Sequence, residues 1–300
     1  MKDFKNRVAF ITGGSSGIGL GIAKCLAREG MKIAFTWRRR DHLDQAMAEL
    51  GSIPDTALLP IELDVVDRVA MRKAAEQTAR VLGPVQLLVN NAGVGVRGPL
   101  AQATYDDWDW VMGVNVGGVI NGIVTFLPEM LAAGHECHIV NISSMGGIAA
   151  FGSVGIYTTS KFAVMGLSES LRNDLRGSRI GVSVYCPGPV CSNIVEAIKG
   201  RPSHLGDTGY VAPDEIPGKP PLSRNPNAMS ADTAAQYVLE GIRQNRLFIL
   251  SHPEYKQLIE SRNNALLAAI PDEPINEARF AAMQWNLTAD IYAEAIRPKT

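Results

Sequence analysis

The stretch Arg7–Gly30, RVAFITGGSSGIGLGIAKCLAREG, decides the fold. It opens with a short apolar run that contains β-branched residues, passes through the glycine-rich turn TGGSSGIG (Thr12–Gly19), and continues as an amphipathic helix that ends at Gly30. This order predicts a strand, a tight turn and a helix in immediate succession. Such a turn lets a pyrophosphate approach the backbone at the helix N-terminus, so we interpret it as a dinucleotide-binding turn rather than a plain tight turn.

Strand-like and helix-like segments alternate from this turn as far as residue 190. Short apolar runs at 32–37, 57–65, 85–93, 138–144 and 180–188 predict strands. Helical patterns lie between them, at about 41–50, 66–82, 105–133 and 157–176, and glycines and Pro128 are expected to bend the third. Continuous apolar strands joined by helices predict a parallel sheet buried on both faces, a doubly wound α/β fold. We expect residues 1–300 to form a single domain, with 1–190 as its cofactor-binding and catalytic core.

The regular pattern stops after residue 190. Residues 191–229 are rich in Pro, Gly and polar residues, and we expect them to cover the site as a substrate-binding lid. Residues 230–300 are expected to add a final helix, the strand RLFIL (246–250), and a helical C-terminal extension interrupted by IPDEP (270–274). Apolar residues in this extension predict packing on the pocket or on a neighbouring subunit, with plain core packing as the alternative; they are Phe280, Met283, Trp285, Leu287, Ile291 and Tyr292.

The composition is that of an ordinary soluble globular protein. Of the 300 residues 46% are hydrophobic and 20% are charged, and the net charge is −1, so neither nucleic acid nor a membrane surface is an expected partner. We find no apolar run of the ~18–20 residues that a spanning helix needs and no cleavable signal at the N-terminus. The four cysteines show no disulfide framework, which favours a reduced, cytoplasmic location. HECH (135–138) is expected to be solvated surface rather than a metal site.

The end of the second strand, TWRRR (36–40), bears on the choice of cofactor. In dinucleotide-binding folds an acidic side chain at this point binds the ribose 2′-hydroxyl, whereas an arginine accommodates a 2′-phosphate. Trp37 stands where an acid could be, and Arg38, Arg39 and Arg40 follow it. Guanidinium groups suit phosphate recognition, so the sequence favours NADP(H) over NAD(H). A solvated basic turn is the alternative interpretation.

YTTSK (157–161) places a phenol and an ammonium four residues apart in a helical pattern. Side chains at i and i+4 share one face of a helix, about 5–6 Å apart at Cβ. A cation beside a tyrosine favours the phenolate and lowers the phenol pKa from its ordinary value of about 10 toward the range of general acid–base catalysis. A packed tyrosine with a solvated lysine is the alternative that this pair alone leaves open.

Six motifs occur in order: TGGSSGIG, NNAG (90–93), Asn115 in NVGG, ISS (142–144), Tyr157 with Lys161, and PGPV (187–190). Over residues 1 to about 192 the chain therefore resembles the short-chain dehydrogenase/reductase (SDR) family, with an extended C-terminus. The resemblance implies a Rossmann-type fold, nicotinamide chemistry, a homodimer or homotetramer formed through the 105–133 and 157–176 helices, and the catalytic set Asn115, Ser144, Tyr157 and Lys161. It also implies a set of cofactor-binding residues: Gly13, Ser15, Ser16, Gly17, Ile18, Gly19, Arg38, Asp64, Val65, Asn91, Ala92, Gly93, Tyr157, Lys161, Pro187, Gly188, Val190 and Ser192.

The resemblance also assigns roles to the catalytic set. Ser144 and Tyr157 would hydrogen-bond the substrate oxygen where negative charge develops, and Tyr157 would donate or accept the proton. Lys161 would lower the pKa of Tyr157 and hold the cofactor ribose. Asn115 would interrupt its helix and hold a water in a proton relay to Lys161, or alternatively cap a local bend.

The substrate is expected to be a hydrophobic or aromatic alcohol or ketone, because the residues available to line the pocket are apolar; they are Met145, Ile148, Phe151, Val154, Ile194, Val195, Ile198 and Tyr210. Arg97 is interpreted as a solvated loop residue rather than an anion site. We therefore expect an NADP(H)-dependent alcohol dehydrogenase or ketoreductase. Two alternatives stay open: a non-catalytic dinucleotide-binding sensor, and an NAD-dependent aryl alcohol dehydrogenase. Family members that oxidise benzylic alcohols of lignin-derived aryl ethers resemble this chain in its tail but have an acid at the position of Trp37.

Overall fold

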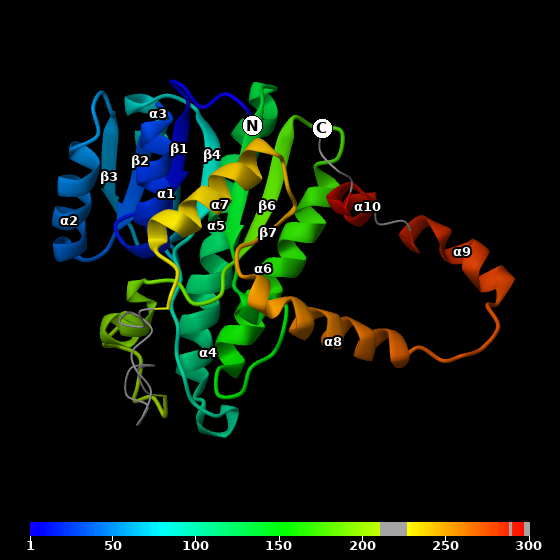
Figure 1. Cartoon of the computed structure of the whole chain (residues 1–300). Coiled ribbons are helices and arrows are strands. Elements are labelled where there is room, and N and C mark those ends of the chain that lie inside the picture. Colours follow the sequence, from blue (N-terminus) through cyan, green and yellow to red (C-terminus); the bar gives the residue numbers. More distant parts are fainter. Residues whose placement is uncertain (211–226, 288–289, 297–300) are drawn as a thin grey trace.

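The computed structural model describes residues 1–210, 227–287 and 290–296. Within these ranges seven strands form one parallel sheet in the order β3-β2-β1-β4-β5-β6-β7 (Figure 1). The strands are β1 (Val8–Ile11), β2 (Lys32–Trp37), β3 (Leu58–Glu62), β4 (Val85–Asn90), β5 (Cys137–Ile142), β6 (Ile180–Cys186) and β7 (Phe248–Leu250). This is the Rossmann-type doubly wound fold that the sequence predicts.

Helices cover both faces of the sheet. One apolar core lies between the sheet and α1 (Gly17–Arg28), α2 (Arg40–Gly51) and α7 (Ala231–Arg243). A second core lies on the other face, under α3 (Arg68–Val81), α4 (Tyr105–Met112), α5 (Gly118–Ala133) and α6 (Gly155–Asp174). The strand order reverses between β1 and β4, and in open α/β sheets a ligand binds at the carboxyl ends of the strands beside such a reversal. The fold therefore fixes where the site must be.

The long helical run 105–133 is bent, as expected, but by a change of helix type. The π-helical segment Gly113–Gly117 separates α4 from α5, while Pro128 lies inside α5. Thr104 and Asp107 form a capping box that starts α4. Contrary to the sequence analysis, the run Tyr105–Ala133 is long and apolar enough to span a membrane; half of its most apolar window is buried inside the protein, as in a core helix. Small and polar residues interrupt the run, so it is not continuously apolar in the sequence.

The expectation that HECH is solvated surface is wrong for its second half. β5 begins at Cys137, which pairs with Ile180, and His138 pairs with Gly181. Cys137 is 1% exposed and His138 is fully buried, with its Nε2 2.8 Å from Ser183 Oγ. The four cysteines are free, as the sequence predicts. Across the described ranges no group of three or more His, Cys, Asp or Glu side chains is placed to hold a metal ion.

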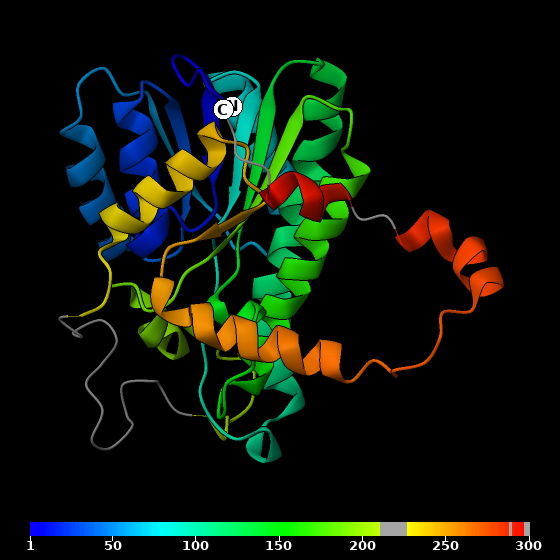
Figure 2. The same cartoon turned by 45° about the vertical axis from the view of Figure 1, so that its right-hand side comes forward.

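The described side chains of the helices α8 (Lys256–Ala268) and α9 (Glu277–Leu287) of the C-terminal extension do not line the pocket of their own chain, although Tyr255 just before them does. Beyond β7 and the short helix η7 (Pro253–Tyr255), α8 and α9 stand away from the body, and α10 (Asp290–Ile296) lies against α6 (Figure 2). Ile291 is buried, as core packing requires, but Phe280 and Met283 are exposed. Packing of Phe280 and Met283 on their own subunit is therefore contradicted. The side chains of Trp285 and Leu287 lie outside the described part.

Candidate active site

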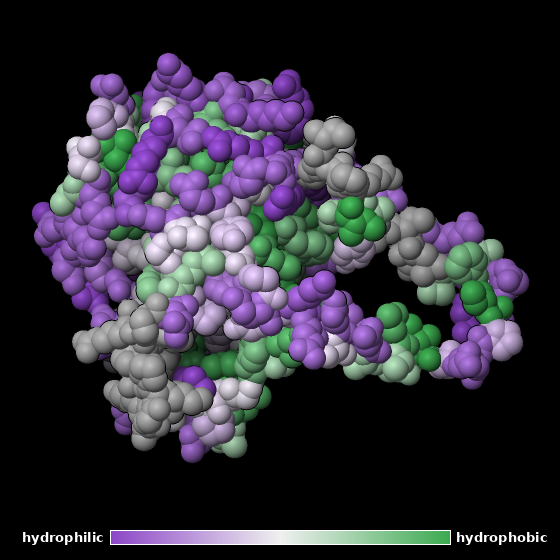
Figure 3. Space-filling model, viewed as in Figure 1, coloured by the Kyte–Doolittle hydropathy of each residue, from purple (hydrophilic) through white to green (hydrophobic). Residues whose placement is uncertain are grey.

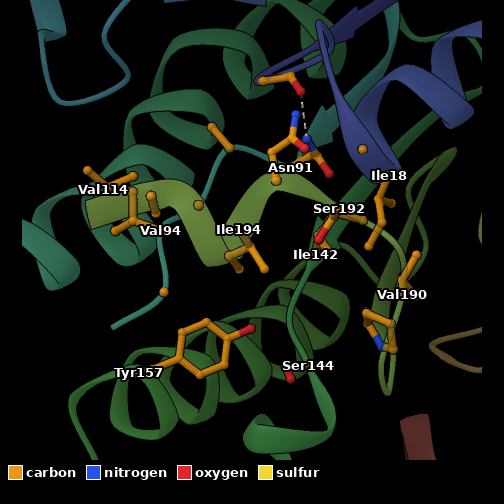
Figure 4. Close-up of a pocket in the computed structure, with 18 of the residues that line it drawn as sticks. Ile18, Asn91, Val94, Val114, Ile142, Ser144, Tyr157, Val190, Ser192 and Ile194 are labelled. Atoms are coloured by element: carbon orange, nitrogen blue, oxygen red, sulfur yellow. Dashed lines mark hydrogen bonds between the residues drawn. The ribbon is translucent and has the colours of Figure 1, made fainter. Parts of the chain in front are cut away.

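A cavity of about 770 Å³ opens at the carboxyl edge of the sheet, beside the reversal of strand order. Residues at the carboxyl ends of all seven described strands line it: within 13–18 after β1, 36–39 at the end of β2, Leu63 and Val65 after β3, 91–97 after β4, 142–146 at the end of β5, within 187–194 after β6, and Tyr255 after β7. Figure 4 shows Asn91, Val190 and Ser192 at one end of this cavity and Tyr157 and Ser144 at the other. Residues distant in the sequence therefore meet in one space.

The glycine turn after β1 has a shape that other residues cannot adopt. Gly13 and Gly17 have φ of +62° and +52°, and a Cβ added at Gly19 would lie 2.4 Å from both Gly13 O and Asn91 Nδ2. Asn91 Nδ2 donates to Thr12 O and Gly13 O, both at 3.0 Å, and so fixes the turn. Ser16, the N-cap of α1, makes no side-chain hydrogen bond to the first helical turn. The turn therefore fits a pyrophosphate, which can take those helix amides as donors.

The arginines after β2 differ in where they lie. Arg38 and Arg39 line the cavity, whereas Arg40 is 76% exposed and bonds Asp44. Arg39 Nη2 is 2.5 Å from Asp41 Oδ2, so this guanidinium is already held at the start of α2. Arg38 Nη2 lies 3.6 Å from Asp64 Oδ2. Of the three, Arg38 is the best placed to meet a phosphate on the adenosine side of a dinucleotide.

Tyr157 and Lys161 occupy successive turns of α6 and face the same side, with Lys161 Nζ 5.5 Å from the centre of the Tyr157 ring. Lys161 is 3% exposed and its Nζ donates to Ile142 O at 3.0 Å. Ser144 follows β5, and its hydroxyl is hydrogen-bonded to that of Tyr157. Figure 4 shows both side chains at the same end of the cavity. The Ser143 hydroxyl instead donates a hydrogen bond to the Lys161 carbonyl oxygen, which indicates a structural role.

Burial is the largest cause of the pKa shifts of both Tyr157 and Lys161. It raises the pKa of Tyr157, an effect that the hydrogen bond from Ser144 partly offsets. Burial also lowers the pKa of Lys161 to about 8. Lys161 thus stays mostly protonated at pH 7. The expected lowering of the Tyr157 pKa by this ammonium is not found: burial raises that pKa, and the lowering contribution comes from Ser144. With its pKa raised, Tyr157 keeps its phenol proton at neutral pH and has an O–H that can donate a hydrogen bond.

Asn115 sits in the π-helical segment behind the cavity, 1% exposed. Its Oδ1 accepts from Val94 N at 2.8 Å, and its Nδ2 donates to Val94 O and to Ser160 Oγ. Both amide hydrogens are used, so a relay water could meet only Oδ1 or the main-chain carbonyl. The side chain holds the loop after β4 against α6.

Most of the predicted site residues are brought together. Those that line the cavity are Gly13, Ser15, Ser16, Gly17, Ile18, Arg38, Val65, Asn91, Ala92, Gly93, Ser144, Tyr157, Lys161, Pro187, Gly188, Val190 and Ser192. Gly19, Asp64 and Asn115 do not line it; Gly19 and Asn115 support the residues that do, and Asp64 pairs with Arg38.

The predicted apolar wall is only partly correct. Met145, Phe151, Val154 and Ile194 line the cavity, and so does Arg97. Ile148 packs beside Met145 in a separate core cluster, Ile198 does not line the cavity, and Tyr210 is 4% exposed within the core under α4. The side chain of Val195 lies outside the described part, as does 211–226 of the predicted lid. The described start of that lid, η4 (Asn193–Gly200), lies over the cavity, and Arg201 Nη1 is 2.7 Å from the buried Asp107 Oδ1.

His252 and Tyr255, which follow β7, were not predicted. Gly188 N donates to His252 Nδ1 at 3.1 Å, and His252 Nε2 lies 3.2 Å from Pro189 O. A backbone N–H only donates and a carbonyl only accepts, so the ring is neutral with its proton on Nε2. A Cβ at Gly188 would lie 2.8 Å from both rings, and Tyr255 lines the cavity with an edge-to-face contact to Phe151. Only their position in the sequence could have indicated a place in the site. They follow the last strand, and residues that follow parallel strands lie at the carboxyl edge of the sheet, where ligands bind.

Comparison with known proteins settles the family. The family model described as short chain dehydrogenase matches residues 7–202. The chain belongs to the short-chain dehydrogenase family. Among curated proteins, the C alpha-dehydrogenase of Sphingobium sp. (strain NBRC 103272 / SYK-6) is 40% identical over 90% of this chain and 88% of its own.

Two solved structures match most of the chain. A putative short-chain dehydrogenase from Novosphingobium aromaticivorans is 37% identical over 98% of both chains, with a TM-score of 0.80. An SDR protein from Burkholderia phymatum in complex with NAD is 32% identical over 92% of this chain and 100% of its own, with a TM-score of 0.81. This short-chain dehydrogenase is thus an oxidoreductase of a family whose members bind a nicotinamide dinucleotide.

Proposed function

We propose that this protein is an NADP(H)-dependent oxidoreductase that interconverts a hydrophobic or aromatic secondary alcohol and its ketone. One observation carries the proposal: the Tyr157 hydroxyl, bonded to Ser144 and close to the buried Lys161, faces the same cavity that the glycine turn lines. Groups that hold a dinucleotide and groups that move a proton therefore share a space of ordinary ligand-pocket size.

A bound nicotinamide ring supplies or accepts the hydride. The chain's own part is to stabilise and protonate the substrate oxygen. Ser144 and Tyr157 can both donate a hydrogen bond to a carbonyl oxygen on which negative charge grows, and Tyr157 then delivers its proton. In the oxidative direction the nearby Lys161 ammonium and the Ser144 hydroxyl stabilise the phenolate that removes a proton from the alcohol.

The lining of the cavity beyond Tyr157 supports an apolar substrate. Met145, Phe151 and Ile194 present apolar side chains, and Tyr255 adds an aromatic ring in edge contact with Phe151. Such a wall favours flat or hydrophobic groups over highly charged metabolites. The name of the relative from Sphingobium, a dehydrogenase, agrees with an alcohol as one partner of the reaction.

The preference for NADP(H) rests on Arg38, which lines the cavity directly after β2 with no acidic residue preceding it there. A second candidate, an NAD-dependent aryl alcohol dehydrogenase, is favoured by two observations. Arg38 lies 3.6 Å from Asp64, which competes for the guanidinium, and the relative from Burkholderia phymatum binds NAD.

The reaction is tested by measuring oxidation of NADPH and NADH with a panel of aryl and alkyl ketones, for the wild type and Tyr157→Phe. General acid catalysis typically contributes 10²–10⁴-fold, so we expect Tyr157→Phe to lose at least about 100-fold in kcat while still binding the cofactor. Equal rates in the two proteins would exclude Tyr157 as the proton donor. Cofactor binding without turnover of any ketone or alcohol would favour the sensor.

Cofactor choice is tested with Arg38→Ala beside Arg40→Ala, a matched control that lies outside the cavity. Loss of a charge-assisted hydrogen bond costs about 1.5–3 kcal/mol, so the Kd for NADPH should rise roughly 10- to 100-fold in Arg38→Ala, with NADH binding unchanged. Arg40→Ala should bind both as the wild type does. Equal weakening toward both cofactors in Arg38→Ala would refute the NADP(H) assignment.

A further inference from the structure

Residues 256–287, from the start of α8 to the end of α9, are here called the arm. Every arm residue whose side chain is described is exposed or half-buried, and none is buried. Large apolar side chains on it face solvent: Leu266 is 54%, Leu267 65%, Ile270 65%, Ile275 68%, Phe280 43% and Met283 41% exposed. Figure 3 shows apolar surface along the arm on both sides of an open gap between the arm and the body.

Helices of this kind do not persist alone in water. α8 has 13 residues and α9 has 11, whereas isolated helices shorter than ~12–15 residues are marginal, because most helix stability in proteins comes from packing an apolar face. The described body of the same chain supplies no such face to most of the arm. Something else must therefore cover these side chains when the arm is helical.

The arm is fixed to the body at both ends. Near its start, Arg262 lies over the Phe162 ring at 5.3 Å, and Ile259 packs on the core cluster of Met145 and Met165. Past its end, Ile291 is 2% exposed and Tyr292 stacks on Phe248, with ring centres 6.3 Å apart. The arm therefore projects from the body as a loop of two helices whose two ends are both packed near α6 (Figures 1 and 2).

We propose that the arm docks on a second copy of this chain, with each arm entering the gap between the arm and the body of the other copy. A twofold arrangement buries the same surface on both copies at once. At roughly half exposure, six such side chains offer on the order of 600 Å² per copy, most of the ~800 Å² per partner of a standard interface.

The charges on the arm agree with this partner. Lys256, Arg262 and Arg279 are balanced by Glu260, Asp272, Glu273 and Glu277, so the arm carries no strong field of one sign. A nearly neutral apolar surface suits another neutral apolar surface, and the whole chain has a net charge of −1, so two copies repel each other little.

The test compares the full-length wild type with Leu267→Lys/Ile270→Lys/Ile275→Lys by sedimentation equilibrium. A control, Val66→Lys/Val69→Lys/Val81→Lys, changes side chains of 45–55% exposure at and around α3. We expect the wild type to be a dimer or larger, the arm variant to associate at least 100-fold more weakly, and the control to match the wild type. Thermal unfolding should show that all three proteins fold, since no changed residue is buried.

Hydrogen exchange separates this arrangement from the alternatives. Arm amides should be protected in concentrated wild-type protein and should exchange freely after dilution and in the arm variant. A monomeric wild type, an arm variant of unchanged mass, or an arm that stays protected in a monomer would each overturn the proposal. The last result would mean that the arm folds onto its own subunit.

Discussion

Replacing Lys161 by Met allows the free-energy cost of burying the Lys161 ammonium in the folded protein to be measured. Lys161 is 3% exposed, and its Nζ donates to Ile142 O. Met keeps a long side chain in the same space but has no charge to desolvate. Activity should be lost, but the more specific consequence is a change in how the stability of the cofactor-free protein depends on pH.

Burial lowers the pKa of Lys161 from 10.5 to about 8. The unfolded chain keeps the ordinary value, so between these two pH values it binds a proton that the folded chain does not, and the free energy of unfolding rises with pH. At ~1.4 kcal/mol per pH unit, the buried ammonium costs about 3 kcal/mol at pH 7.5 and about 1 kcal/mol at pH 10. Wild type should therefore gain about 2 kcal/mol over this interval relative to Lys161→Met.

The assay is urea unfolding of both proteins at pH 7.5 and pH 10, at one protein concentration and with a reductant. Cysteine and tyrosine titrations are common to both proteins and cancel in the difference. Lys199→Met, which removes a lysine whose side chain is 65% exposed, should keep the wild-type dependence on pH. If wild type and Lys161→Met change in parallel between the two pH values, Lys161 is not an ammonium forced out of water, and the account of the site is wrong.

Three further outcomes follow from contacts around the site. His252→Ala should raise the Kd for the cofactor up to about 30-fold, because one hydrogen bond is worth ~1 kcal/mol and the Gly188–Pro189 backbone loses two, whereas His252→Gln should restore part of the affinity in the same titration. Asp107→Asn should cost about 3–5 kcal/mol in urea unfolding, because Arg201 would stay buried without its partner; a cost below 1 kcal/mol would contradict this. Ile291→Ala should cost about 2–5 kcal/mol and speed hydrogen exchange in α10 first; uniform loss across the sheet would show that α10 is not a separate anchor.

The features that the sequence predicts correctly are local ones. The glycine turn and the alternation of strands and helices each depend on residues close together in the chain, and so does the shared face of Tyr157 and Lys161. Spacing alone determines these. The same holds for the bend near Asn115, although the sequence does not show that a π-helical segment produces it.

The features that the sequence misses depend on contacts between distant segments. His252 meets Gly188 only because β7 pairs with β6, and His138 is buried only because β5 lies inside the sheet. The pKa of Tyr157 follows from how much protein surrounds it, which spacing does not reveal. Tyr210, expected at the pocket, is drawn into the core under α4 for the same reason.

The short edge strand β7 bears on the order in which this protein loses its coenzyme and unfolds when it is heated. β7 is three residues long and pairs, among the described strands, only with β6. Two residues after it comes His252, whose ring holds the Gly188–Pro189 backbone. Fraying begins at such margins, where the fewest bonds must open. Heat should therefore release the coenzyme while the central strands are still intact, so that inactivation precedes melting by several degrees.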